Sequence, residues 1–223
     1  MSRRRIIIVD DHPLFRAALR QTLATGDPTV SVEEAGDLAG LSAALESERD
    51  CDLVLLDLNM PGVRGFSGLL LLRAQYPDLP VMIISAVEDT TVIRRAFELG
   101  AAGYLSKSVG PAEIRRSIET VLAGEVFVPE GTDLRVDDEQ TALMHRLSSL
   151  TPQQVRVLMM LSDGLMNKQI AYELSISEAT VKAHVSAILQ KLDVDSRTQA
   201  VIAAARIEEG QFEALLATGR PPT

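Results

Sequence analysis

Short, continuous runs of apolar residues mark the first 125 positions of the chain. They are Ile6–Val9, Leu53–Leu56, Val81–Ile84 and the shorter Tyr104–Leu105. A strand that is buried on both faces of a parallel sheet shows a continuous apolar run, whereas a strand with one wet face alternates apolar and polar residues. The pattern therefore predicts four buried strands, and the alternating segment Val30–Ala35 predicts a fifth strand at a sheet edge.

Segments with helical periodicity lie between these predicted strands. Leu19 and Leu23 are four residues apart after the first run, and Ile114 and Ile118 are four residues apart after the last one. Apolar residues at this spacing lie on one face of an α-helix. Strand and helix alternate five times, which predicts a doubly wound α/β domain with a five-stranded parallel sheet over residues 1–124.

The chain changes character after this domain. Residues 125–147 combine an extended pattern, an acidic stretch at Asp133–Glu139 and helical spacing at Leu143 and Leu147, which predicts a linker with some ordered structure. From Thr151 onward the pattern is helical, with predicted helices at 152–163, 167–173, 178–191 and 197–207. We therefore expect a small all-α domain at 148–210, followed by a C-terminal tail, 211–223, that frays.

Polar residues capable of chemistry follow directly after the predicted strands of the first domain. They are Asp10, Asp11, Asp57, Ser85 and Lys107. The carboxyl ends of parallel strands converge on one edge of an open sheet, and ligands bind there. We therefore expect three carboxylates, a hydroxyl and an ammonium group to meet in one pocket. Close carboxylates repel one another unless a cation lies among them, and such hard oxygen ligands suit Mg²⁺.

A carboxylate beside such an ion can act as a covalent nucleophile toward a phosphoryl group. The simpler interpretation is that an Asp after a strand only caps the next helix and that the lysine is solvated. Five such groups, each in order at the end of its own strand, favour the pocket over this interpretation.

The first domain closely resembles the flavodoxin-like receiver domain of bacterial two-component response regulators, over about residues 4–122. Four segments carry the resemblance: IIIVDDHPLFR, LVLLDLNMPG, VMIISA and GYLSK. The resemblance implies that Asp57 accepts a phosphoryl group from a histidine kinase. It also implies that Asp10, Asp11, Asp57 and the backbone carbonyl of Asn59 hold Mg²⁺.

The same resemblance implies roles for three further residues. Lys107 would pair with the phosphoryl group, Ser85 would bond one of its oxygens, and Tyr104 would be an aromatic switch that turns inward when Ser85 moves. One residue departs from the family pattern, because Ser108 stands where many receivers have proline. A cis peptide bond after the lysine is therefore not expected, since it is costly without proline.

Residues 178–191 show the sharpest pattern of the C-terminal half. Val181, Val185, Ile188 and Leu192 have the spacing of one buried helical stripe. Small and polar residues lie on the opposite face: Ala179, Thr180, Lys182, Ala183, Ser186 and Gln190. Such a face lets a helix approach the major groove of DNA closely, and we expect Lys168, Lys182 and Lys191 to reach phosphates or bases. An ordinary helical bundle with a solvated polar face would show similar spacing.

The second domain strongly resembles the LuxR-type helix-turn-helix DNA-binding domain. Three segments carry the resemblance: LTPQQVRVLMML, GLMNKQIAYELSISEATVKAHVSAILQKL and DVDSRTQAV. Together with the receiver, they make the chain similar to NarL/FixJ-type response regulators. The resemblance implies that 178–191 is the recognition helix, that Lys182 and Ala183 face bases, and that Lys191 lies near the DNA backbone. It also implies that the helix at 197–207 is a dimer contact.

Two further departures concern this second domain. Gln154 stands where the family commonly has glutamate, so we expect a weaker internal salt bridge. Ser186 occupies a position that is basic in some members, so a base preference cannot be copied from a relative.

Charge and cysteine content narrow the class of protein further. The net charge of −9 argues against a strongly basic nucleic-acid coat. From residue 150 onward, 7 Lys and Arg residues stand against 8 Asp and Glu residues, so DNA binding there depends on where the few cations lie and on dimerisation. The single cysteine, Cys51, excludes an internal disulfide and fits a reducing compartment.

The apolar runs also bear on location. None approaches the ~20 residues that a membrane span requires. The basic start, Arg3–Arg5, is followed by an apolar run too short for a signal peptide. We therefore expect a cytoplasmic protein with no membrane partner.

These observations predict a phosphorylation-controlled transcription regulator, not an enzyme, whose partners are a histidine kinase and double-stranded DNA. We expect a weakly binding monomer at rest, with the receiver covering the recognition helix, and a homodimer on phosphorylation. A phosphatase of the haloacid-dehalogenase type would share the aspartyl-phosphate chemistry, but it requires Asp where this chain has Asn59. A helical domain that binds protein or RNA, and regulation without phosphate, remain as alternatives.

Overall fold

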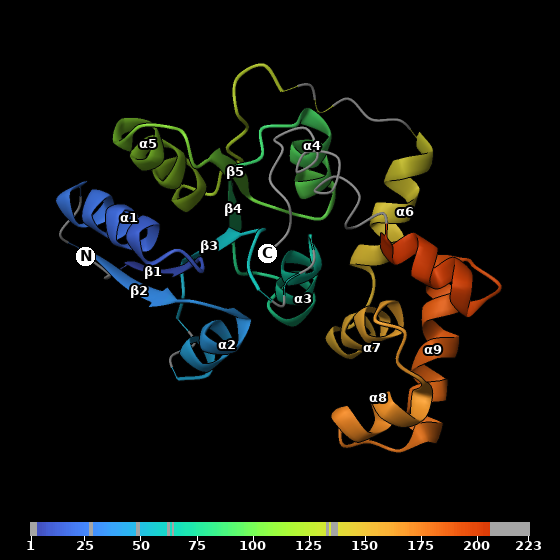
Figure 1. Ribbon diagram of the computed structural model, residues 1–223. Coiled ribbons are helices and arrows are strands. Elements are labelled where there is room, and N and C mark those ends of the chain that lie inside the picture. The colour runs from blue at the N-terminus through green and yellow to red at the C-terminus, as the bar shows by residue number, and fades with distance from the viewer. Residues whose placement is uncertain are drawn as a thin grey trace.

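The computed structural model describes residues 4–26, 29–47, 50–61, 63, 65–132, 134 and 138–205, and the statements below concern these residues. An α/β domain is followed by a group of helices (Figure 1). The strands are β1 (Arg4–Val9), β2 (Val30–Ala35), β3 (Leu53–Asp57), β4 (Val81–Ser85) and β5 (Gly103–Ser106). The helices of this domain are α1 (Pro13–Gly26), α2 (Leu38–Ser47), α3 (Ser67–Gln75), α4 (Thr90–Glu98) and α5 (Pro111–Leu122).

The five strands form one parallel sheet in the order β2-β1-β3-β4-β5. Every residue of β3 and β4 is buried, as their continuous apolar runs predict, whereas β2 lies at an edge and is mostly half-buried. Helices α1 and α5 cover one face of the sheet, and α2, α3 and α4 cover the other (Figure 1). The doubly wound α/β fold predicted from the sequence is therefore confirmed.

The strand register brings the carboxyl ends of the central strands to one edge. Val9 of β1 is level with Leu56 of β3, and Ser85 of β4 is level with Ser106 of β5. The residues that follow these positions therefore emerge side by side, and they include the polar residues singled out above.

The C-terminal part is all helical, as predicted. Its elements are α6 (Asp138–Ser148), α7 (Pro152–Ser162), α8 (Asn167–Glu173), α9 (Glu178–Leu192) and a helical segment at 197–205. Three predicted features cannot be compared in full, because their residues lie outside the described residues or have no described side chains. They are the last two positions of the predicted helix 197–207, most of the acidic stretch 133–139 and the predicted tail 211–223. The domain boundaries at 124 and 148 stay predictions.

Helix α7 begins with a capping box formed by Thr151 and Gln154. The Thr151 hydroxyl accepts a hydrogen bond from the Gln154 backbone N–H at 3.3 Å, and the Gln154 side chain accepts one from the Thr151 N–H at 2.9 Å. This reciprocal pair satisfies two donors that a helix start otherwise leaves open.

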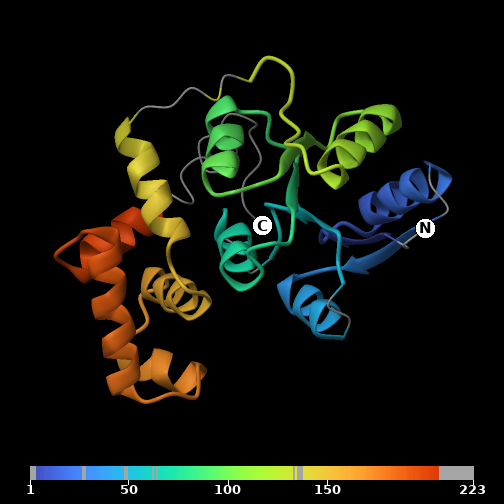
Figure 2. The same ribbon diagram turned by 180° about the vertical axis from the view of Figure 1, so that it is seen from behind.

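The two parts of the chain pack together through four helices. Helix α7 lies against α3, and α6 lies against both α3 and α4 (Figures 1 and 2). Buried apolar residues form one continuous cluster across this contact. No helix among the described residues is both long and apolar enough to cross a membrane.

Candidate functional site

Three carboxylates meet at the edge of the sheet. Asp10 follows β1 and is 2% exposed, Asp57 ends β3 and is 1% exposed, and Asp11 is half-buried. One oxygen from each, together with a ring nitrogen of His12, lie within 4.8 Å of one another. The sheet topology thus concentrates negative charge where water is largely excluded, which is costly unless cations neutralise it.

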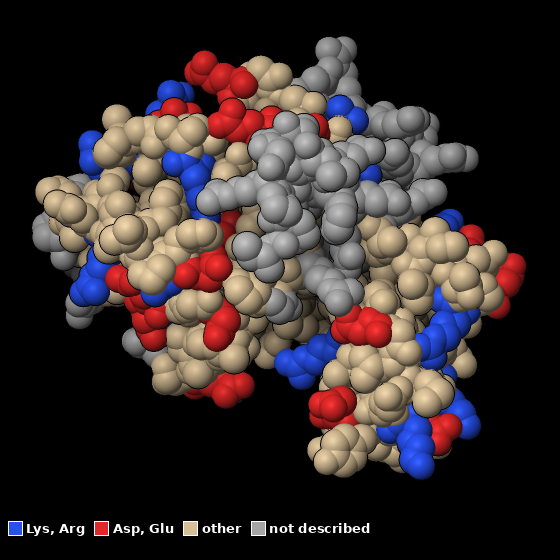
Figure 3. Space-filling view, viewed as in Figure 1, with Lys and Arg blue, Asp and Glu red and all other residues tan. Residues whose placement is uncertain are grey.

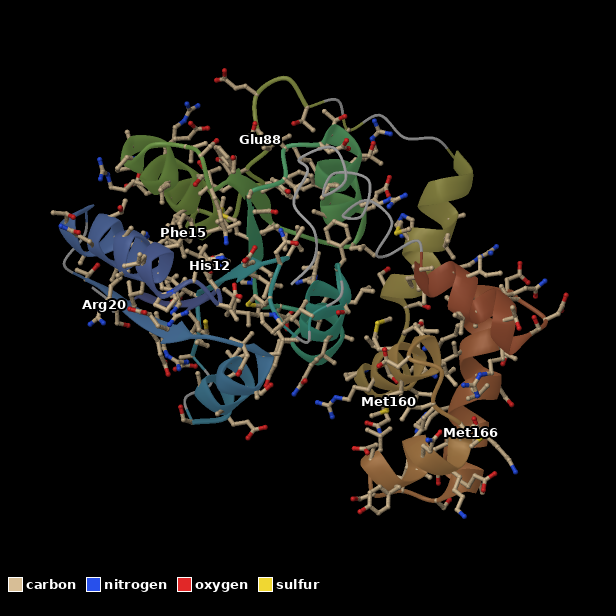
Figure 4. The ribbon with its side chains drawn as sticks, in the orientation of Figure 1. His12, Phe15, Arg20, Glu88, Met160 and Met166 are labelled. Atoms are coloured by element: carbon tan, nitrogen blue, oxygen red, sulfur yellow. The ribbon has the colours of Figure 1, made fainter. Side chains whose placement is uncertain are left out.

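Lys107, which follows β5, supplies part of that neutralisation. Its Nζ lies 2.6 Å from Asp10 Oδ2 and donates a hydrogen bond of 2.8 Å to Asp57 Oδ2. The same Nζ lies 4.9 Å from the centre of the Phe15 ring, a cation–π contact that covers the ammonium group. Figure 4 shows Phe15 and its neighbour His12 at the start of α1, next to the sheet edge.

The electrostatic balance at Asp57 favours an added cation. Burial raises the pKa of the Asp57 carboxyl above its ordinary value, Lys107 opposes this shift, and Asp10 adds to it. The single positive charge of Lys107 therefore does not balance the negative charges of the clustered carboxylates. A further cation would favour the ionised form of Asp57.

The donor set fits a divalent metal ion. Asp10 Oδ2 and Asp11 Oδ1 are buried oxygens without a hydrogen-bond partner of regular geometry among the described residues. Asp11 Oδ1 also lies 2.7 Å from Nδ1 of His12. Hard carboxylate oxygens of this kind are the ligands that small divalent cations prefer. Asn59, the other predicted ligand, donates its backbone N–H to Asp57 Oδ1 at 3.2 Å.

Ser85 and Tyr104 are both buried beside this cluster. The Ser85 Oγ accepts a hydrogen bond of 3.2 Å from the Val87 backbone N–H, and the Tyr104 hydroxyl donates one of 2.7 Å to the Val87 carbonyl. Tyr104 is 1% exposed, and burial raises the pKa of its phenol. The residue predicted to turn inward therefore already lies inward in this structure. The Lys107 backbone N–H, in turn, donates to the Ser85 carbonyl at 2.8 Å.

The second set of predicted site residues lies on α8 and α9. Val181, Ile188 and Leu192 are buried as the predicted stripe requires, and Val185 is half-buried. The outer face is exposed, including Thr180, Lys182, Ala183 and Ser186, and so is Lys168 on α8. The expectation that the first domain covers this face is wrong for this structure, because the α/β domain contacts α6 and α7 and leaves this face exposed.

Polar contacts at the two ends of α9 distinguish its lysines. Lys182 lies on the surface, and its Nζ is 3.1 Å from Glu178 Oε1 one turn earlier. Lys191 is half-buried, and its Nζ donates to the Ser149 carbonyl at 2.7 Å and to Gln154 Oε1 at 2.9 Å. Lys191 therefore ties α9 to the start of α7, and a DNA contact by this residue stays a prediction.

Two further features concern the start of α9 and the charge on the surface of the helical domain. The Thr180 backbone N–H donates to the Ser177 hydroxyl at 3.0 Å, so Ser177 caps α9. On the face of the molecule shown in Figure 3, acidic and basic side chains alternate over the helical domain and do not form one continuous basic patch.

The sequence patterns missed several contacts near the pocket. Arg16 donates to the Asp10 carbonyl at 2.5 Å, and Glu88 accepts hydrogen bonds from Ser106 and Ser108. The spacing of Glu88 and the two serines along the chain carries no signal for this cluster, because loop conformation brings them together. The residue type at position 108, serine where the family often has proline, is the part of this cluster that the sequence analysis noted. No peptide bond among the described residues is cis.

Comparison with known proteins gives matches over both parts. Residues 6–119 match the family model of the response regulator receiver domain, and residues 148–204 match that of the bacterial regulatory proteins of the luxR family. The chain is 42% identical to the glycerol metabolism activator of Pseudomonas putida over 92% of this chain and 96% of the relative. It is 38% identical to the nitrate/nitrite response regulator NarP of Escherichia coli K12, over 88% and 92% of the two chains. A LuxR-family DNA-binding response regulator from Silicibacter pomeroyi is 33% identical, with a TM-score of 0.51 over 57% of this chain and 98% of that one.

Proposed function

This chain belongs to the two-component response regulators that join a receiver domain to a LuxR-type helix-turn-helix domain, and from that premise we propose that phosphorylation of Asp57 by a histidine kinase controls its binding to DNA. The family consists of transcription regulators and not of enzymes. The observation that carries the proposal is the pairing of buried Asp57 with Lys107, at 2.8 Å, within the carboxylate cluster.

The proposed chemistry is the transfer of one phosphoryl group. An Asp57 carboxylate oxygen attacks the phosphorus of the kinase's phosphohistidine, an O–P bond forms, and the N–P bond breaks. The histidine nitrogen leaves with the electron pair of that bond and takes up a proton. When bound, Mg²⁺ would neutralise negative charge on the phosphoryl group.

The surrounding residues hold the reacting carboxylate in place. We assign Mg²⁺ to Asp10, Asp11, Asp57 and the backbone carbonyl of Asn59, a set supported by the clustering of the three carboxylates within 4.8 Å. Lys107 is assigned to the phosphoryl oxygens because its ammonium group lies against Asp57.

Ser85 and Tyr104 would report the phosphoryl group to the rest of the domain. Ser85 bonds a phosphoryl oxygen, and Tyr104 is the switch residue whose hydroxyl follows the loop after β4. The proximity of both side chains to Val87 supports this coupling.

The output is binding of α9 in the major groove of double-stranded DNA. Lys182, Ala183 and Ser186 would face the bases, with Thr180 and Lys168 beside them, and the exposure of all five supports this assignment. Residues 148–204, which include α9, match the family model of the bacterial regulatory proteins of the luxR family, and this match supports the same output.

Dimerisation would link the two domains' activities. A single helical domain with balanced charge neutralises few phosphates, so it binds DNA weakly, whereas two linked copies bind two half-sites together. The segment 197–205 supports a dimer contact, because Ile202 on it is 55% exposed. We place this homodimer in the cytoplasm, where the kinase's phosphohistidine and the DNA are both accessible.

Intact-mass measurement after incubation with acetyl phosphate and Mg²⁺ tests the proposal. We expect one phosphoryl adduct on the wild type, none on Asp57→Asn, and a wild-type yield on Asp78→Asn, a matched control at an exposed turn. An equal yield on Asp57→Asn would contradict the assignment of the phosphoacceptor.

A further inference from the structure

Glu88 is an exposed residue in the loop between β4 and α4 whose side chain is tied to the end of β5. Its Oε1 accepts hydrogen bonds from the Ser106 hydroxyl at 2.5 Å and from the Ser108 hydroxyl at 2.7 Å. The Ser108 backbone N–H also donates to the Ser106 hydroxyl at 3.1 Å, which fixes the two serines relative to each other. We call Glu88, Ser106 and Ser108 the Glu88 clamp. Figure 4 shows Glu88 at the sheet edge, between α4 and α5.

The clamp acts on the same peptide unit that Tyr104 contacts. The Val87 carbonyl, which accepts the Tyr104 hydroxyl at 2.7 Å, belongs to the peptide bond between Val87 and Glu88. On its other side, the Val87 N–H donates to Ser85 Oγ. This short loop is therefore anchored through Ser85 at one end and through the Glu88 side chain at the other.

The strand geometry places the two serines on the correct side for this anchor. Side chains two positions apart along a strand point to the same face, so Ser106 of β5 lies on the face of Tyr104, while Lys107 points to the carboxylate cluster. Ser108 supplies a hydroxyl that a proline at this position would not have. The two hydrogen bonds also lower the pKa of the Glu88 carboxyl, so it remains a charged acceptor at neutral pH.

We propose that Glu88 is a positioning residue of the phosphorylation switch: the clamp holds the Val87 carbonyl where it accepts the Tyr104 hydroxyl, and so it stabilises the inward position of Tyr104. The inference rests on the proposed function, in which phosphorylated Asp57 and inward Tyr104 favour one another. Two states coupled in this way influence each other equally, so a clamp that favours inward Tyr104 also favours a phosphoryl group on Asp57.

Beryllofluoride, a non-covalent mimic of the phosphoryl group, allows this coupling to be measured at equilibrium. Apparent affinity scales with the populated fraction of the competent state. Removing the clamp costs about one net hydrogen bond, so Glu88→Ala should weaken beryllofluoride binding roughly three- to tenfold. Glu88→Gln keeps an acceptor oxygen and should fall between the wild type and Glu88→Ala, and Ser108→Ala should weaken binding less than Glu88→Ala.

The experiment uses the full-length chain labelled with 3-fluorotyrosine, in which Tyr104→Phe assigns the Tyr104 signal in ¹⁹F NMR spectra. We expect the Tyr104 signal of Glu88→Ala to move toward a solvent-exposed position without beryllofluoride, and to return when the mimic saturates Asp57. Glu46→Ala, at an exposed glutamate of α2, is the matched control and should match the wild type in both readouts. Melting temperatures, expected to be near the wild-type value, check that each variant folds.

The outcomes separate this inference from the proposed function. An unchanged Tyr104 signal in Glu88→Ala, together with beryllofluoride affinity within twofold of the wild type, would overturn the positioning role. Equal binding of beryllofluoride to the wild type and Asp57→Asn would overturn the assignment of Asp57 instead. The Tyr104 signal recorded without beryllofluoride would still decide whether the clamp positions that side chain.

Discussion

Asp57 and Lys107 are held in one geometry by buried ion pairs at the edge of the sheet, whereas Lys182 and Ala183 lie exposed on a helix surface with few protein contacts. The pocket is organised by contacts within the protein, because several elements converge on it and low solvent access strengthens each charge interaction. The outer face of α9 has no comparable network of buried ion pairs among the described residues. Substitutions in the pocket should therefore act through charge and coordination, and those on α9 through steric fit and stability.

The largest expected effect on the exposed face is steric and electrostatic. Ala183→Glu should lower DNA affinity by more than about 100-fold, because it drives a carboxylate into an acidic groove. Ala183→Ser, of similar size, is the matched control and should bind nearly as the wild type does. Fluorescence anisotropy on DNA fragments selected by the wild-type protein measures both. Wild-type binding by Ala183→Glu would mean that α9 does not read DNA.

In the pocket, the corresponding test removes one of the carboxylates proposed to bind Mg²⁺. Asp11→Ala should weaken Mg²⁺ binding about tenfold or more, since fewer carboxylates remain to replace the ion's water shell. Isothermal calorimetry measures the affinity, and Asp37→Ala, at an exposed carboxylate after β2, serves as control. Equal Mg²⁺ affinity in Asp11→Ala and the wild type would show that Asp11 only caps the start of α1.

Substitution of the two lysines of α9 distinguishes a residue that stabilises the fold from one that contacts DNA. Lys191→Ala should lower the free energy of unfolding by ~1–2 kcal/mol, because it removes bonds to Ser149 and Gln154. Lys182→Ala removes only an exposed pair, so its stability should change by less than about 1 kcal/mol while DNA affinity falls. Chemical denaturation and DNA titration of both variants decide this. A reversed pattern would place Lys191 on the DNA-reading face.

The smallest expected effect concerns acid stability. Because the pKa of Asp57 is raised in the folded protein, the unfolded chain loses its proton first as pH rises above the ordinary value of 3.8. The unfolded state then binds fewer protons than the folded state, so ionisation of Asp57 lowers stability as pH rises through this window. In EDTA, Asp57→Asn should therefore gain stability relative to the wild type between pH 4 and pH 7. Urea unfolding across that range measures the difference. A constant difference would show that Lys107 fully compensates the buried charge.

Sequence patterns predicted the sheet and pocket because both depend on strand ends. The continuous apolar run Leu53–Leu56 fits a central strand that is buried on both faces of the sheet. The residue after it must therefore emerge at the edge of the sheet where ligands bind. The same patterns could not predict the Glu88 clamp, because its three side chains meet through loop conformation. They also could not predict that the Lys191 side chain bonds to Gln154, since periodicity records the face of a helix but not whether a long side chain folds back onto a neighbouring helix. A DNA contact by Lys191 stays a prediction.

The packing of α3 against α7, which leaves the outer face of α9 in solvent, has a consequence for how the protein searches a genome. A protein whose reading helix is always open samples non-cognate DNA at every encounter. Lys182 is paired with Glu178, and Lys191 is bonded to Ser149 within the fold, so we expect each encounter to release few counterions. Non-cognate residence is then brief and only weakly dependent on salt. Target location should proceed mainly by repeated three-dimensional collisions and not by long one-dimensional sliding.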